Sequence, residues 1–176
     1  MRGKVTSILI DDIRTGAGSK LLASIGLAPF FLIILMKLGF LPLSRLLSEK
    51  TGFDLSGYYS LIALTVAAIV SATPGFYFAF ISLRQKNQGE EYLTKSGENS
   101  SAYLLNVRAW AAFISGFILV CLFNIITDPL PGEGPYRMLY ASVLLAFQSL
   151  TALIFIVSLS ASLLRGIFMS KLYGIL

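Results

Sequence analysis

Four long apolar stretches, separated by polar or charged segments, dominate the pattern of hydrophobic and polar positions along the chain. They fall at about residues 21–41, 59–83, 102–126 and 136–164. Each is long enough to cross a bilayer as a helix, which takes about 20 residues. The pattern therefore predicts an all-α, polytopic integral membrane protein with a single transmembrane domain, residues 1–176, and four transmembrane helices.

Two shorter segments have the character of helices at the membrane surface. In residues 3–15, the apolar residues recur at helical spacing and share one face: Val5, Ile8, Leu9 and Ile13. This spacing favours an N-terminal amphipathic helix on the cytoplasmic surface, ended by Gly16 and Gly18. Residues 42–57 are expected to form the first loop, with three leucines on one face of a short interfacial helix: Leu43, Leu46 and Leu47.

Prolines and small residues mark where the spans are expected to bend and to touch. Pro29 lies near the middle of the first span, and Pro74 with Gly75 lies in the second. We predict helix kinks at these three residues, which a membrane bundle tolerates because neighbouring helices satisfy the freed backbone groups. Small residues recur four apart in the second span, at Ala63, Ala67, Ser71 and Gly75, and again at Ala112 and Gly116 in the third. Such rows allow helices to approach closely.

Polar side chains inside the apolar spans are few. Asn124 lies in the third span and Gln148 in the fourth. Groups of this kind in lipid usually form a hydrogen bond to a neighbouring helix. The alternative is that Asn124 and Gln148 line a substrate path, and both residues are retained as candidates for it.

The connector between the second and third spans, residues 84–101, is the most polar segment of the chain. It contains Arg84, Lys86, Glu90, Glu91, Lys95 and Glu98. Its length exceeds that of a tight turn. Either it is a plain solvated loop, or residues 90–95 form a short helix across the membrane face.

Lysine and arginine set the expected orientation. With the N-terminus inside, ten of them fall on the cytoplasmic side: Arg2, Lys4, Arg14, Lys20, Arg84, Lys86, Lys95, Arg108, Arg165 and Lys171. Four fall outside: Lys37, Arg45, Lys50 and Arg137. Basic residues concentrate in cytoplasmic loops. We therefore expect a multi-pass protein of the plasma membrane, with both termini and the connector 84–101 in the cytoplasm.

The amino-acid composition excludes several classes of function for this chain. The 176 residues are 56% hydrophobic and 13% charged, far from a soluble domain. The net charge of +5 is attributed to orientation in the membrane and not to nucleic-acid binding. The chain has no histidine, which excludes a His-ligated metal site and a Ser-His-Asp triad within it. No pair of carboxylates falls within a span, so catalytic residues and an enzymatic activity are not expected.

Four stretches, in this order and spacing, resemble the membrane-spanning permease subunits of type 2 ATP-binding-cassette exporters, including bacterial drug-export permeases. They are ILIDDIRTGAGSKLLASIGLAPFFL, LSGYYSLIALTVAAIVSATPGFYFAFISLRQKNQGEEYL, SSAYLLNVRAW and LLRGIFMSKLYGIL. The first is similar to the family's amphipathic helix and proline-containing first span, and the last to its junction before the fifth span. Family members usually have six spans, so the chain is similar to the N-terminal four-span portion. The family loop usually contains a Thr-Pro-Leu-Ser motif, whereas residues 94–98 here contain no proline.

The resemblance implies a permease that provides the membrane pathway and couples to a separate nucleotide-binding ATPase subunit. The coupling loop is then the run Gln88, Gly89, Glu90, Glu91, Tyr92 and Leu93. The sequence contains no phosphate-binding G-x-x-x-x-G-K-[ST] motif, so ATP is expected on the partner and no cofactor on this chain. The resemblance also implies a second permease copy or half. The alternative is a small non-transporting membrane protein with an immunity, anchoring or regulatory role.

Overall fold

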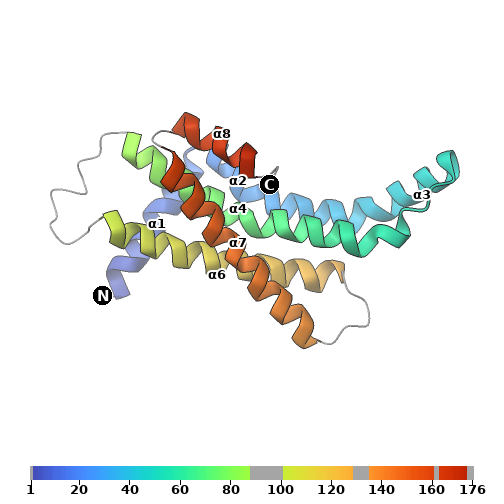
Figure 1. The fold of residues 1–176 in the computed structure, drawn as a ribbon. Helices are drawn as coiled ribbons and strands as arrows, with labels where there is room; N and C mark the ends of the chain where they lie inside the picture. The colour runs from blue at the N-terminus through green and yellow to red at the C-terminus, as the bar shows by residue number, and fades with distance from the viewer. Residues whose placement is uncertain (1, 88–100, 129–134, 161–162, 174–176) are drawn as a thin grey trace.

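The computed structural model describes residues 2–87, 101–128, 135–160 and 163–173, and these residues form helices joined by short turns, with no strand among them (Figure 1). The helices are α1 (Arg2–Ala17), α2 (Lys20–Ile34), α3 (Phe40–Thr51), α4 (Tyr59–Asn87), α6 (Ser101–Thr127), α7 (Pro135–Leu159) and α8 (Leu163–Tyr173). A π-helix, η1 (Leu35–Gly39), joins α2 to α3, and a 3₁₀ turn, η2 (Ser56–Tyr58), precedes α4. The all-α prediction is confirmed.

Four helical runs are long and apolar enough to cross a membrane: Lys20–Thr51, Ser56–Lys86, Ala102–Thr127 and Tyr136–Leu159. The chain is therefore a multi-pass membrane protein, as the sequence predicted. Three boundaries differ. The first run continues to Thr51, so the expected first loop begins as helix α3, which contains the expected short helix with Leu43, Leu46 and Leu47. α4 continues to Asn87 although the second span was predicted to end at residue 83, and α7 ends at Leu159 although the fourth span was predicted to reach residue 164.

The continuation through Pro42 follows from the π-helix just before it. Proline in an α-helix has no N–H to donate, and its ring clashes with the carbonyl four residues earlier. That residue is Leu38, which lies in η1. A π turn shifts the bonding to the fifth residue and changes the local path of the helix. Pro42 is accommodated there, and α3 runs on to Gly52, whose φ of 70° gives the left-handed cap that glycine adopts readily.

The centre of the bundle is formed by α4, α6 and α7, which pack against one another; α7 crosses the other two (Figure 1). The rows of small residues lie at these contacts, as predicted. Ala63, Ala67, Ser71 and Gly75 are all buried along α4, and so are Ala112 and Gly116 on α6. A Cβ on Gly75 would overlap the Ser149 carbonyl on α7, and one on Gly116 would overlap the Ser149 hydroxyl. The three helices therefore meet with backbone in contact.

The N-terminal part of the chain packs differently. α2 lies mainly along α4 and touches α6 little, while α1 crosses one end of the bundle and contacts α2, α4 and α6 (Figure 1). α1 ends at Ala17, beside the two glycines expected to stop it. One face of α1 is turned to the bundle, whereas Ile10 and Ile13 are more than half exposed.

Candidate functional site

A buried ion pair joins α1 to α6. The guanidinium of Arg108 donates from Nε to Oδ2 of Asp12 at 2.8 Å and from Nη2 to Oδ1 at 2.7 Å. The two side chains are 4% and 1% exposed. This is the two-pronged geometry in which a guanidinium fits a carboxylate best. Both carboxylate oxygens are therefore paired out of contact with solvent.

Two neutral side chains of α4 complete the shell around Arg108. Its Nη1 donates to the Ser82 hydroxyl at 3.0 Å, and its Nη2 donates to the amide oxygen of Gln85 at 2.7 Å. A charge removed from water is stable only when it is paired and its hydrogen bonds are satisfied. The cluster Asp12–Ser82–Gln85–Arg108, hereafter the polar clamp, meets that condition and ties three helices together.

The clamp lies next to the charged connector in the chain. Gln85 is two residues from the end of α4, and Arg108 is in the second turn of α6. These helices are the two that lead into and out of residues 88–100. The third member, Asp12, is provided by α1. The clamp thus links the first helix of the chain to both ends of the connector.

This pair was not predicted from the sequence, although the position of Asp12 in α1 is a signal for it. Asp12 follows Val5 by seven residues, about two helical turns, so it falls within the apolar face of the amphipathic helix and not opposite it. A carboxylate in such a place needs a partner. The partner could not be identified from the sequence, because Arg108 is 96 residues away.

The predicted coupling loop, Gln88 to Leu93, lies outside the described residues. The two candidates for a substrate path lie at helix–helix contacts. Asn124, which is buried, donates from Nδ2 to the Ser142 hydroxyl of α7 at 2.9 Å. Gln148 accepts a 2.9 Å bond from the Ser71 hydroxyl of α4. Asn124 and Gln148 therefore form hydrogen bonds to different residues, Ser142 and Ser71, and within the described part of the chain they share no hydrogen-bond partner.

The residues predicted to kink their helices are buried within uninterrupted helices. Pro29 lies inside α2, and Pro74 and Gly75 lie inside α4. Pro29 and Pro74 also face a common space. Both line a groove between α2 and α6, together with residues of α1 and α4.

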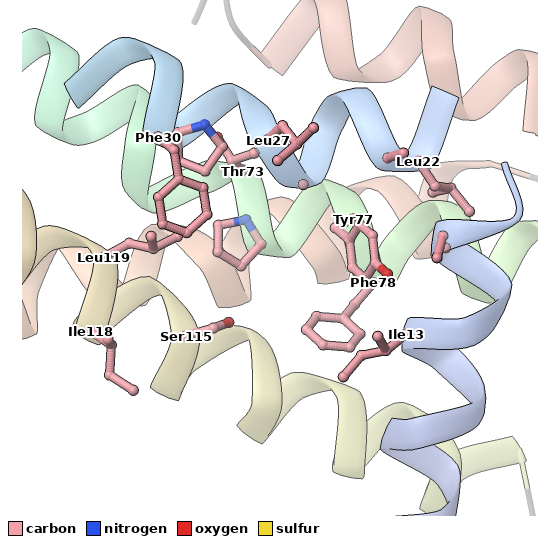
Figure 2. Close-up of a pocket in the computed structure, with 16 residues that line it drawn as sticks. Ile13, Leu22, Leu27, Phe30, Thr73, Tyr77, Phe78, Ser115, Ile118 and Leu119 are labelled. Carbon is pink, nitrogen blue, oxygen red and sulfur yellow. The ribbon is translucent and has the colours of Figure 1, made fainter. Parts of the chain in front are cut away.

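The groove has a volume of about 680 Å³ and opens to the side of the bundle. Figure 2 shows Phe30 projecting into it from α2, with Tyr77 and Phe78 between the helices and Ser115 on the side of α6. None of its 16 lining residues carries a charge. The groove is therefore apolar, has aromatic walls, and lies along helices that belong to the candidate membrane spans.

These features define the class of the chain as a polytopic α-helical membrane protein with a side-opening apolar cavity and a polar clamp beside its charged connector. A family model described as Fluoroquinolones export permease protein Rv2686c-like matches residues 12–176, and the chain belongs to that family. The match covers both partners of the ion pair and the whole groove. Neither a curated protein nor a solved structure matches the chain. The family name is that of an export permease, which places the chain among transport proteins rather than enzymes, as the resemblance implied.

Proposed function

We propose that the chain is the membrane-spanning subunit of an ATP-driven exporter and that a separate nucleotide-binding subunit hydrolyses the ATP. The observation that carries this proposal is the match to an export permease family. The match covers residues 12–176, which include all four candidate membrane spans in full. The chain itself is expected to bind no cofactor. A second permease copy or half would complete the pathway.

The connector 84–101 is the proposed contact with the ATPase subunit, through Gln88, Gly89, Glu90, Glu91, Tyr92 and Leu93. The polar clamp supports this assignment. A force applied to the connector would act on the ends of α4 and α6, where Ser82, Gln85 and Arg108 lie. Because Arg108 holds Asp12, the same movement would reach α1. The ten-to-four distribution of basic residues supports a cytoplasmic connector, and an inner-membrane location is part of the same proposal.

The family name specifies fluoroquinolones, so a fluoroquinolone is the first substrate to test on this chain. Cells that lack the gene are expected to accumulate more of the drug than cells that carry it, and an uncoupler of ATP synthesis should remove the difference. If deletion leaves accumulation unchanged, the non-transporting alternative replaces the exporter proposal.

The connector is tested by reversing the charges of Glu90 and Glu91 together, as E90K/E91K. We expect loss of co-purification with the ATPase subunit and loss of export, while the amount of chain in the membrane stays constant. The matched control is E98K, which reverses a charge in the same connector outside the proposed contact. Normal export by E90K/E91K, or equal loss in E98K, would contradict the assignment of residues 88–93.

A further inference from the structure

We infer that the groove between α2 and α6 is a binding site for an uncharged, largely apolar aromatic molecule of drug size, reached sideways from the bilayer. This inference rests on the proposed function, of which it would be the substrate-capture step. The candidates from the sequence, Asn124 and Gln148, do not line the groove.

The groove exists because the helices around it pack unequally. α4 forms its floor and packs tightly on α6 and α7, but α2 packs on α4 and scarcely reaches α6. α1 closes one end. There Gly16 makes room for the hydroxyl end of Tyr77, since a Cβ on Gly16 would overlap it. Gly26 of α2 lies beside the same edge of the ring, with its notional Cβ 3.8 Å from Cε2. Two glycines thus seat the Tyr77 ring as an end wall.

Size sets the class of ligand. Small-molecule sites in proteins measure about 300–1,000 Å³ and are mostly apolar with aromatic walls. The volume here, about 680 Å³, falls within that range. Phe30, Tyr77 and Phe78 contribute aromatic rings from two helices, and flat rings pack well against a flat aromatic ligand (Figure 2).

The charge and the hydrogen bonding of the lining side chains determine how polar the ligand can be. The three hydroxyl groups in the lining already donate to backbone carbonyls: Thr73 to Ile69 at 2.9 Å, Ser115 to Ala111 at 2.6 Å, and Tyr77 to Asp12 at 3.4 Å. The nearby carboxylate of Asp12 is held by Arg108 through both oxygens. A charged ligand would therefore lose its hydration without gaining a counter-ion, so the lining selects an uncharged one; of a fluoroquinolone, which has a carboxyl group and an amine, the groove would take the uncharged form and not the zwitterion.

The mouth of the groove opens toward lipid. Leu27 is 66% exposed and Ile118 is 56% exposed, on opposite sides of the opening, whereas Leu22 and Pro29 are buried deeper in. A molecule dissolved in the acyl-chain region could thus enter without crossing the headgroups. The hydrocarbon chains of lipid are the competing occupant, but they offer no flat ring to the aromatic walls.

The inference is tested by tryptophan quenching in the purified full-length chain, reconstituted in phosphatidylcholine vesicles. Trp110 is the only tryptophan, so Trp110→Phe gives a silent background. Phe30→Trp then reports on the groove. Ile114→Trp, on an exposed α6 position that does not line the groove, reports on lipid. The probe is 9,10-dibromoanthracene, which is uncharged, flat and a strong quencher.

We expect quenching of the groove tryptophan to saturate, with half-saturation at a probe concentration at least tenfold below that which half-quenches the lipid-facing tryptophan. Gly26→Leu should abolish the saturable component by filling the groove. Ser24→Leu, an exposed position on the same helix, should leave it intact. Circular dichroism of both variants checks that the helices are retained.

Equal and non-saturating quenching of both tryptophans would overturn the inference. So would stronger quenching of the groove tryptophan by lipids with brominated acyl chains than by the probe, because lipid then fills the groove. A groove tryptophan that neither reagent quenches would also overturn it, since a protein segment then covers the site. The experiment needs no ATP and no partner, so its result is separate from that of the accumulation assay, which tests the proposed function.

Discussion

Replacing Arg108 with methionine is expected to destabilise the bundle by about 3–5 kcal/mol, the usual cost of removing one partner of a buried ion pair. Methionine is nearly as long as the apolar part of arginine, so the change removes the charge with little loss of packing. What remains is the carboxylate of Asp12, 1% exposed and without its counter-ion.

The structure indicates where that cost falls. Arg108 makes four hydrogen bonds, but two of their acceptors tolerate its loss. The Ser82 hydroxyl keeps its own bond to the Phe78 carbonyl at 2.9 Å, and Gln85 is only half-buried, so its amide can turn to water. Asp12 has no such alternative.

Two further variants separate the contributions of the pair. Asp12→Leu leaves the Arg108 guanidinium buried without its counter-ion, although Ser82 and Gln85 still accept its hydrogen bonds. The double variant D12L/R108M removes both charges. Well-packed apolar replacements of whole pairs are often neutral, so the double variant should be more stable than R108M.

The assay is unfolding of the purified chain in mixed micelles, followed by circular dichroism as a denaturing detergent is added. Arg45→Met, at an exposed position of α3, is the matched control. The reasoning is refuted if R108M is destabilised by no more than R45M, or if the effects of D12L and R108M simply add in the double variant. Either result would mean that the pair is solvated and does not hold α1 to α6.

Two further predictions use the same assay. Gly75→Ala places a methyl group on the Ser149 backbone and should lower the stability of the bundle by about 1–3 kcal/mol through overpacking. Gly57→Ala, where no atom lies within 4 Å, should lower the stability far less. Equal effects of the two variants would contradict the close helix contact. Asn124→Leu removes the bond to Ser142 and should cost roughly 0.6–1.7 kcal/mol. If Asn124 also lines a substrate path, its leucine variant will export less than a Ser142→Ala variant of equal stability; equal export would leave it a packing residue only.

The sequence predicts the spans and the close helix contacts because their signals are local. A long apolar run has few alternatives to a membrane helix, and small residues four apart fall on one face whatever the rest of the chain does. The end of the first span was not predictable in this way. The expected end of that span, residue 41, directly precedes Pro42, and the π turn that accommodates the proline is formed by residues 35–39, which carry no distinctive pattern.

The site was less accessible to prediction because its parts are distant in the chain. Asp12 is recognisable as unusual on the apolar face of α1, but only the folded bundle pairs it with Arg108. The groove leaves no sequence signal at all, because it arises from the poor contact of α2 with α6. Asn124 and Gln148 were singled out for polarity alone, and a polar side chain in a span does not reveal in the sequence whether it faces a helix or a pathway.

The backbone contact of Gly75 with Ser149 also limits how this chain can change shape. Sliding α4 along α7 by one residue would bring a residue with a side chain to the place that only glycine fits, so small shear movements between these helices are blocked. Since α6 contacts the same serine through Gly116, we expect the three helices to move together as one body. The remaining freedom belongs to α2, which is joined to α1 by the short turn at Gly18. Opening and closing the molecule would then be a swing of one helix against a fixed block of three.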